Sequence, residues 1–193
     1  STGSIVIARH AIAPAAVIRS FEASFELQMT GRGVGNGLSF VYGLPPNGFQ
    51  DWPSYRGAFG ENGTARGLNV HFKTDGFGRQ MYVEGDRPVD QVLEVTYDGE
   101  VVERMWLGDS LRTNSWANVT IRYDDDGLEV VHNGDRRIAN LPLFGYKPTS
   151  KWQFAIGAHS SPQGDTHKLD NLRIRSGELI HEATVSLAVS VNG

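Results

Sequence analysis

The chain has 193 residues, 39% of them hydrophobic, which is enough apolar material for one folded domain and excludes intrinsic disorder. Its net charge of -4 is small and evenly spread, which excludes a protein that follows the phosphate backbone of a nucleic acid. The lack of cysteine excludes disulfides, thiolate catalysis and cysteine-ligated zinc, and no apolar run reaches the ~18 residues of a membrane-spanning helix.

The first twenty residues are rich in isoleucine, valine and alanine, but Arg9, His10 and Pro14 interrupt the apolar run, so we do not interpret it as a signal peptide. A processed leader or excision from a longer extracellular protein would each explain the start at Ser1. We expect residues 1–193 to form a single domain of such a protein.

From position 21 onward, apolar and polar residues alternate, which predicts half-buried strands and no helix longer than about a turn. The predicted strands cover residues 21–29, 38–42, 68–72, 93–97, 101–105, 119–123, 128–132, 154–156, 169–175 and 179–191. Asp98-Gly99, Asp126-Gly127 and Asn133-Gly134 predict hairpin turns, because primed turns need residues that tolerate positive φ. The region around these three turns is therefore a predicted meander.

The longest irregular stretch covers residues 43–67 and contains four aromatic residues, Phe49, Trp52, Tyr55 and Phe59. Loops of this length inside a compact domain are usually functional or disordered. The number of aromatic residues favours a functional loop.

Seven segments occur in an order that resembles a known superfamily: SFEASFEL, NGLSFVYG, GAFGENGTARGLNVHFKT, WANVTIRYDDDGLEVVHNG, IANLPLFGYKP, WQFAIGAHS and LDNLRI. Together they resemble the concanavalin A-like lectin/glucanase superfamily, close to L-type lectins and laminin-G-like modules. The resemblance implies an all-β fold, a two-sheet antiparallel jelly-roll β-sandwich with ligand loops at one edge of the concave sheet. It constrains activity less than fold, since one fold hosts many functions.

In L-type lectins an Asp-Gly pair helps to shape the sugar site, and the matching pair here is Asn36-Gly37. A Glu-x-Asp-Thr strand end helps those lectins to bind calcium and manganese, and the matching stretch here is His71-Phe72-Lys73-Thr74. Both carboxylates are replaced, and a lysine opposes a divalent cation. We therefore expect the legume-type metal site to be absent.

The candidate ligand-binding residues lie in the long loop and beside it. Glycines in the 57–67 segment would let backbone N–H groups approach a sugar, and exposed aromatic rings would stack on it; a plain flexible loop and aromatic residues that cap the core are the alternatives. We expect Trp106, Trp116 and Trp152 to belong to the core. The candidate ligand-binding residues are Asn36, Trp52, Tyr55, Glu61, Asn62 and His71.

Calcium is an optional cofactor, and its candidate ligands are Asp165 and His167 in the loop before the last long predicted strand. Asp170 and Asn171 fit a structural role better, as side chains that bond to loop backbone. The acidic run at positions 124–126 fits a solvated hairpin tip better than a calcium site.

We predict no catalytic activity, because the Glu-x-Asp-x-Glu run that glucanases of this fold place on one strand is missing. The predicted function is a carbohydrate-binding or adhesion module at the cell surface or outside the cell, with a glycan or surface glycoprotein as partner and no insertion into a membrane. A structural or protein-interaction domain of the laminin-G-like kind is the alternative. A polysaccharide lyase or hydrolase is less favoured; a lyase would use His71 and Lys73, which share one strand face.

Overall fold

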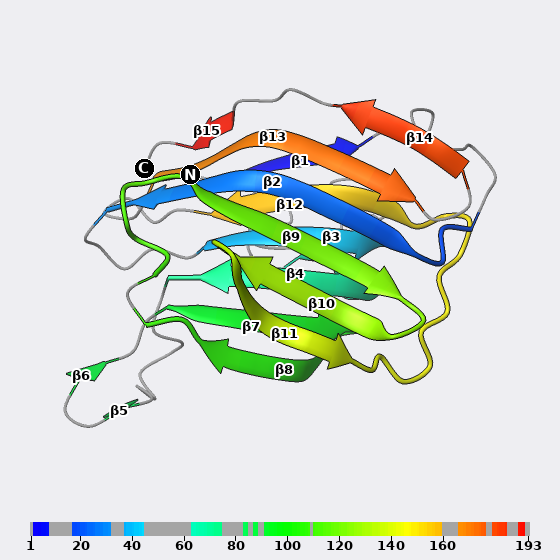
Figure 1. The fold of residues 1–193 in the computed structure, drawn as a ribbon, viewed down its shortest axis with the longest axis horizontal. Helices are drawn as coiled ribbons and strands as arrows, with labels where there is room; N and C mark the ends of the chain where they lie inside the picture. The colour runs from blue at the N-terminus through cyan, green and yellow to red at the C-terminus, as the bar shows by residue number, and fades with distance from the viewer. Residues whose placement is uncertain are drawn as a thin grey trace.

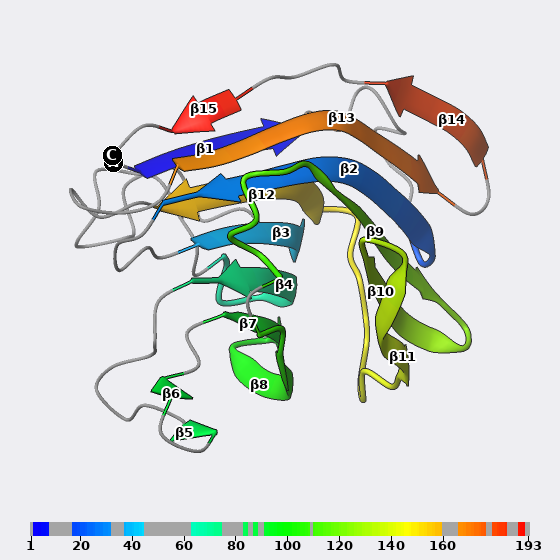
Figure 2. The same cartoon turned by 60° about the vertical axis from the view of Figure 1, so that its left-hand side comes forward.

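The computed structural model contains two antiparallel β-sheets packed face to face (Figures 1 and 2), which confirms the predicted all-β, two-sheet sandwich. The structure describes residues 2–7, 17–31, 37–44, 63–74, 83–84, 87–88, 91–108, 110–159, 166–176, 179–184 and 189–191. Among these residues, no helix is long and apolar enough to cross a membrane.

The first sheet has six strands, in the spatial order β1 (Thr2–Ile7), β12 (Gln153–His159), β3 (Gly37–Gly43), β4 (Gly67–Lys73), β7 (Val92–Tyr97) and β8 (Glu100–Trp106). The second has seven, in the order β11 (Asp135–Leu141), β10 (Gly127–His132), β9 (Ala117–Asp124), β2 (Phe21–Thr30), β13 (Thr166–Ser176) and β14 (Leu179–Thr184), with β15 (Val189–Val191) also paired to β13. A separate two-stranded ribbon joins β5 (Val83–Glu84) to β6 (Arg87–Pro88).

The core lies between the two sheets and follows the period of two in the sequence. Along β2 every second residue is buried, beginning with Phe21, as the alternation predicts. Aromatic rings fill the centre of the core, where Phe40 and Tyr42 of β3 meet Phe21 of β2 at centroid distances of 5.9 and 5.3 Å. Such ring contacts add specific geometry to the burial of apolar area, so these side chains fix how the sheets face each other.

Two of the predicted hairpin turns have the backbone that their sequences favour. Asp98 and Gly99 have φ of 48° and 87°, and Asn133 and Gly134 have φ of 52° and 86°. Two successive residues with positive φ are the mark of a type I′ turn, whose twist matches the flanking strands. The hairpins are therefore confirmed, but they do not form one meander: β7–β8 is an edge of the six-stranded sheet and β9–β10–β11 an edge of the seven-stranded sheet.

The structure differs from the sequence-based expectations at several places. Residues Thr2–Ile7 form an edge strand that no alternation signalled, and the segment predicted at 179–191 forms two strands, β14 and β15. Trp116 was expected in the core, but it is 43% exposed, because it lies just before β9 begins and outside the inward alternation of that strand. Trp106 was also expected in the core, but it is only partly buried at the end of the edge strand β8, whereas Trp152 is buried, as expected.

Candidate functional site

The candidate site is built on the side of the six-stranded sheet that faces away from the sandwich core, which we call the outer face. Along β4, Leu68, Val70 and Phe72 belong to the core. Because side chains alternate along a strand, Asn69, His71 and Lys73 project to the outer face. These three are joined there by Ser39 of β3 and by Glu94 and Thr96 of β7, which oppose His71 and Asn69 in the strand register.

These polar side chains are nearly inaccessible to solvent. Ser39 and Asn69 are 0% exposed, His71 is 1%, Glu94 is 2% and Lys73 is 3%. A buried polar group without a partner is costly, so a group of this size persists only if its members bond to one another.

Asn69 is the centre of a hydrogen-bond cluster that ties a loop to the sheet. Its Oδ1 accepts from the backbone N–H of Thr64 at 2.8 Å, and its Nδ2 donates to the backbone oxygen of Thr64 at 2.9 Å. Nδ2 also donates to Oγ1 of Thr96 at 3.0 Å, and Nε2 of His71 lies 3.1 Å from the same hydroxyl. Gly63 packs so closely that a Cβ on it would lie 2.2 Å from Asn69 Oδ1. The segment that begins at Gly63 is therefore fixed to the outer face.

An ionic triad occupies the other end of the outer face. Glu94 receives the Lys73 ammonium on Oε1 and the Arg104 guanidinium on Oε2, with Arg104 Nε at 2.7 Å. Burial alone would raise the pKa of Glu94, but the two cations outweigh burial and hold the pKa below its ordinary value of 4.5. One carboxylate between two cations leaves this triad with a net charge of +1.

The triad does not fit a divalent cation. At the positions where the resemblance implies metal-binding carboxylates, His71 bonds to a threonine and Lys73 places an ammonium group. Both oxygens of the one nearby carboxylate, Glu94, are already engaged by cations. No group of three or more histidines, aspartates or glutamates within the described ranges is arranged to hold a metal. The expectation that a legume-type metal site is missing here agrees with this donor set.

Two of the predicted site residues fall within the described part of the chain. His71 lies on the outer face as described above. His167 was expected in the loop before the last long strand, but it lies within β13 opposite Met29, 1% exposed and on the same inward-facing side as Leu169. The other predicted site residues lie outside the described residues: Asn36, Trp52, Tyr55, Glu61, Asn62 and Asp165. The predicted ligand and metal roles therefore stay predictions.

Asp170 and Asn171 were expected to bond to loop backbone, but the structure places both within β13, where they bond to each other and to Glu26 of β2. They sit at an irregularity of the β2–β13 pairing, where Asn171 has a φ of 54°. The Asn171 N–H donates to Asp170 Oδ1 at 2.7 Å, and its Nδ2 donates to Oε2 of Glu26 at 2.7 Å.

Sequence reasoning missed Asn69, Glu94, Thr96 and Arg104. The signal for Glu94 was a charged residue within the apolar alternation Leu93, Val95 and Tyr97, which places the carboxylate on the face opposite the core. A carboxylate on one strand and Lys73 on another predict a pair only if the two strands are known to be neighbours, and that knowledge requires the sheet topology.

Comparison with solved structures places this architecture among lectin folds. The exoplasmic/lumenal domain of VIP36, in a Ca2+/Man-bound form, matches with a TM-score of 0.63 and 14% identity over 96% of this chain and 81% of that chain. The carbohydrate recognition domain of Emp47p matches with a TM-score of 0.61 and 15% identity over 92% and 79%. Lectin I-B4 from Griffonia simplicifolia, in a metal-free form, matches with a TM-score of 0.55 and 21% identity over 82% and 72%.

No protein-family model and no curated protein matches the sequence. The likeness is thus one of structure. It confirms the expected fold, a two-sheet antiparallel sandwich that these solved domains share.

Proposed function

We propose that this chain is a carbohydrate-binding module of the adhesion kind, one domain of a surface or secreted protein whose partner is a glycan or a surface glycoprotein. The observation that supports it most is the structural likeness over 92% or more of the chain to domains named as carbohydrate recognition or sugar-bound forms. The identity is too low to transfer individual binding residues, so the site is proposed from this chain's own residues.

In this proposal the sugar binds at the edge of the outer face and contacts Asn36, Trp52, Tyr55, Glu61 and Asn62. Two of them are chain neighbours of residues held against β4. Asn36 precedes Gly37, which pairs with Lys73, and Asn62 precedes Gly63, which packs on Asn69. His71 is proposed to support this edge from beneath through its contact with Thr96.

The proposal includes calcium as an optional ligand at Asp165 and His167, away from the triad. The test is the melting temperature with calcium and with a chelator, because a ligand that binds only the folded state raises it. A calcium-dependent rise that Asp165→Asn abolishes and Lys73→Met preserves supports this placement. A rise that Lys73→Met abolishes contradicts it.

A glycan array tests sugar binding directly, with wild type, Trp52→Ala and Trp116→Ala, each with and without calcium. Trp116 is exposed on the other sheet and provides a matched control for loss of a surface indole. We expect wild type and Trp116→Ala to bind the same glycans, and Trp52→Ala to bind them at least tenfold more weakly. An array without any binder, or equal binding by all three proteins, would contradict the proposed site.

The alternative proposal is a non-catalytic structural or protein-interaction domain, and the closed outer face favours it. Its sheet-borne polar groups bond to one another and expose almost no surface to a ligand. The same closure disfavours a lyase: Arg104 does join Lys73 on the face of His71, but Glu94 neutralises part of their charge. Protein binding without glycan binding, in the same array format, would support this alternative.

A further inference from the structure

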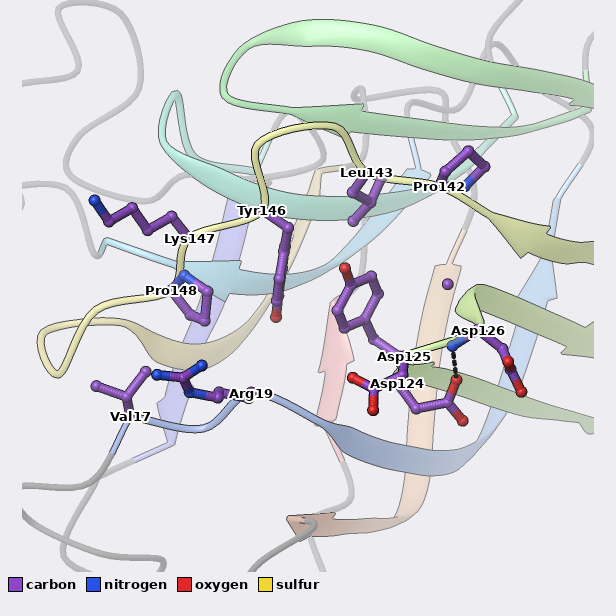
Figure 3. A pocket seen from close by; sticks show the side chains of 12 residues that line it. Val17, Arg19, Asp124, Asp125, Asp126, Pro142, Leu143, Tyr146, Lys147 and Pro148 are labelled. Atoms are coloured by element: carbon purple, nitrogen blue, oxygen red, sulfur yellow. Dashed lines mark hydrogen bonds between the residues drawn. The ribbon is translucent and has the colours of Figure 1, made fainter.

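A cavity of about 570 Å³ lies between the β9–β10 hairpin and the connection that follows β11 (Figure 3). Three segments line it: the chain entering β2 at Val17 and Arg19, the β9–β10 hairpin at residues 123–127, and the connection at residues 142–148. Of the residues beside the cavity, Leu143 belongs to the core between the sheets, and Tyr123 and Tyr146 pack against that core. The proposed sugar site lies on the outer face, so the six-stranded sheet separates the two sites, and the size of the cavity is typical of small-ligand pockets.

Tyrosine hydroxyls hold two walls of this cavity in place. Tyr42 Oη donates to the backbone oxygen of Ile18 at 2.8 Å. Tyr97 Oη donates to the backbone oxygen of Gly145 at 3.0 Å and accepts from the backbone N–H of Lys147 at 3.2 Å. Since the walls are pinned without a ligand, little ordering entropy is lost when one binds.

The cavity carries free charges of both signs. Asp124 is engaged, since it accepts from the N–H of Asp126 at 3.0 Å and lies 3.3 Å from Arg122. The Asp125 and Asp126 carboxylates have no ion pair within the described residues, and neither do the cationic side chains of Arg19 and Lys147. The charges of these two carboxylates and two cationic side chains cancel. The cavity therefore presents hydrogen-bond acceptors and donors together and favours neither an anionic nor a cationic ligand.

Tyr146 adds an aromatic surface to the wall of the cavity. Its ring lies 4.0 Å from the ring of Tyr123, centroid to centroid. Its hydroxyl is buried without a hydrogen-bond partner in the described structure, and burial raises its pKa, so it is a neutral donor. Figure 3 shows its side chain between Arg19 on one side and Asp124 and Asp125 on the other.

We propose that this cavity is a second ligand site, which binds a neutral saccharide residue. Sugar hydroxyls both donate and accept, so they match carboxylates and cations presented together, and the apolar face of a sugar ring matches Tyr146 and the neighbouring prolines. Asp125 and Asp126 would repel a phosphate or sulfate, and Arg19 and Lys147 would repel an organic cation. This site is independent of the proposed outer-face site, and each stands if the other fails.

Amide chemical-shift titration of the full chain tests the site, with the methyl glycosides of mannose, glucose, galactose and N-acetylglucosamine as probes. We expect at least one probe to shift the amides of Gly127 and Lys147. Asp125→Asn should weaken its binding by about tenfold or more, because hydrogen bonds to a charged group contribute most, and Lys147→Met should weaken it by a similar factor. Asp135→Asn, an exposed aspartate at the next hairpin, is the matched control and should bind like wild type.

Tyr146→Phe keeps the ring and its packing and removes a hydroxyl that is closed to solvent, so this variant should bind like wild type. The proposal is overturned if no probe shifts these amides, if Asp125→Asn and Lys147→Met both bind like wild type, or if tetramethylammonium or sulfate occupies the cavity in place of the sugars. Trp52→Ala separates the two sites, since it tests the outer-face edge and leaves the shifts at Gly127 and Lys147 unchanged.

Discussion

Replacing Glu94 by glutamine removes the only carboxylate of the buried triad. The glutamine keeps the size and shape of the side chain, so the change is one of charge. The Lys73 side chain is 4% exposed and would lose its counter-charge inside the protein, whereas Arg104 is 31% exposed and would keep part of its hydration.

The expected loss follows from that difference in burial. Removing one partner of a buried ion pair costs about 3–5 kcal/mol, because the other charge is left uncompensated. Arg104 adds at most about 1 kcal/mol, since partly solvated pairs contribute little. For a chain of this length, a loss of about 3–5 kcal/mol lowers the melting temperature by roughly 6–20 °C.

Urea unfolding measures this loss as a change in midpoint at constant slope. Glu22→Gln is the matched control, since Glu22 is exposed and 4.0 Å from Arg175, and it should cost less than about 1 kcal/mol. The double variant Lys73→Met with Glu94→Gln removes the stranded ammonium and should recover most of the loss. A Glu94→Gln loss equal to that of Glu22→Gln, or no recovery in the double variant, would refute the account of the triad.

Three further predictions concern pH and packing. The pKa of Glu94 is lowered in the folded protein, so its ionised carboxylate adds to the free energy of unfolding above pH 4.5, and this stabilisation is lost as pH falls through the lowered pKa. Glu94→Gln has no such carboxylate and should therefore lose less stability in acid than wild type, as urea unfolding at several pH values would measure. The pKa of His132 is lowered from 6.5, first by burial, so wild type should lose stability below about pH 6.5, and His132→Leu should flatten stability between about pH 7 and 5 in calorimetry; an unchanged profile would contradict this. Gly37→Ala places a Cβ 2.2 Å from the Phe72 carbonyl oxygen at a φ of 138°, so it should cost more than about 1 kcal/mol in urea unfolding, and a neutral result would mean that the β3–β4 pairing shifts freely.

The core was predictable from the sequence because alternation alone decides which residues face inward. Leu68, Val70 and Phe72 needed no knowledge of their partners. The triad was not predictable, because Lys73 opposes Val92 in the register and reaches Glu94 diagonally. Long side chains make such diagonal contacts, but only the strand order reveals them.

The edge strand β1 shows a different limit. Its segment contains the unbroken apolar run Ile5, Val6 and Ile7, which has no period of its own and is equally compatible with a strand or a buried turn of helix. Its pairing with β12 decides between them, and that pairing joins residues about 150 positions apart in the sequence.

The polar side chains of the outer face are almost fully buried and already engaged. They form hydrogen bonds and ion pairs with one another. The Lys73 ammonium lies where the resemblance implies a metal ion, so this face needs no bound metal ion to hold its side chains in place. Side chains that are already engaged have little left to offer a ligand. If a glycan binds at this edge, as proposed above, its selectivity has to come from the segments that Asn69 and Gly37 anchor. Substitutions in the triad are then expected to change stability before they change binding.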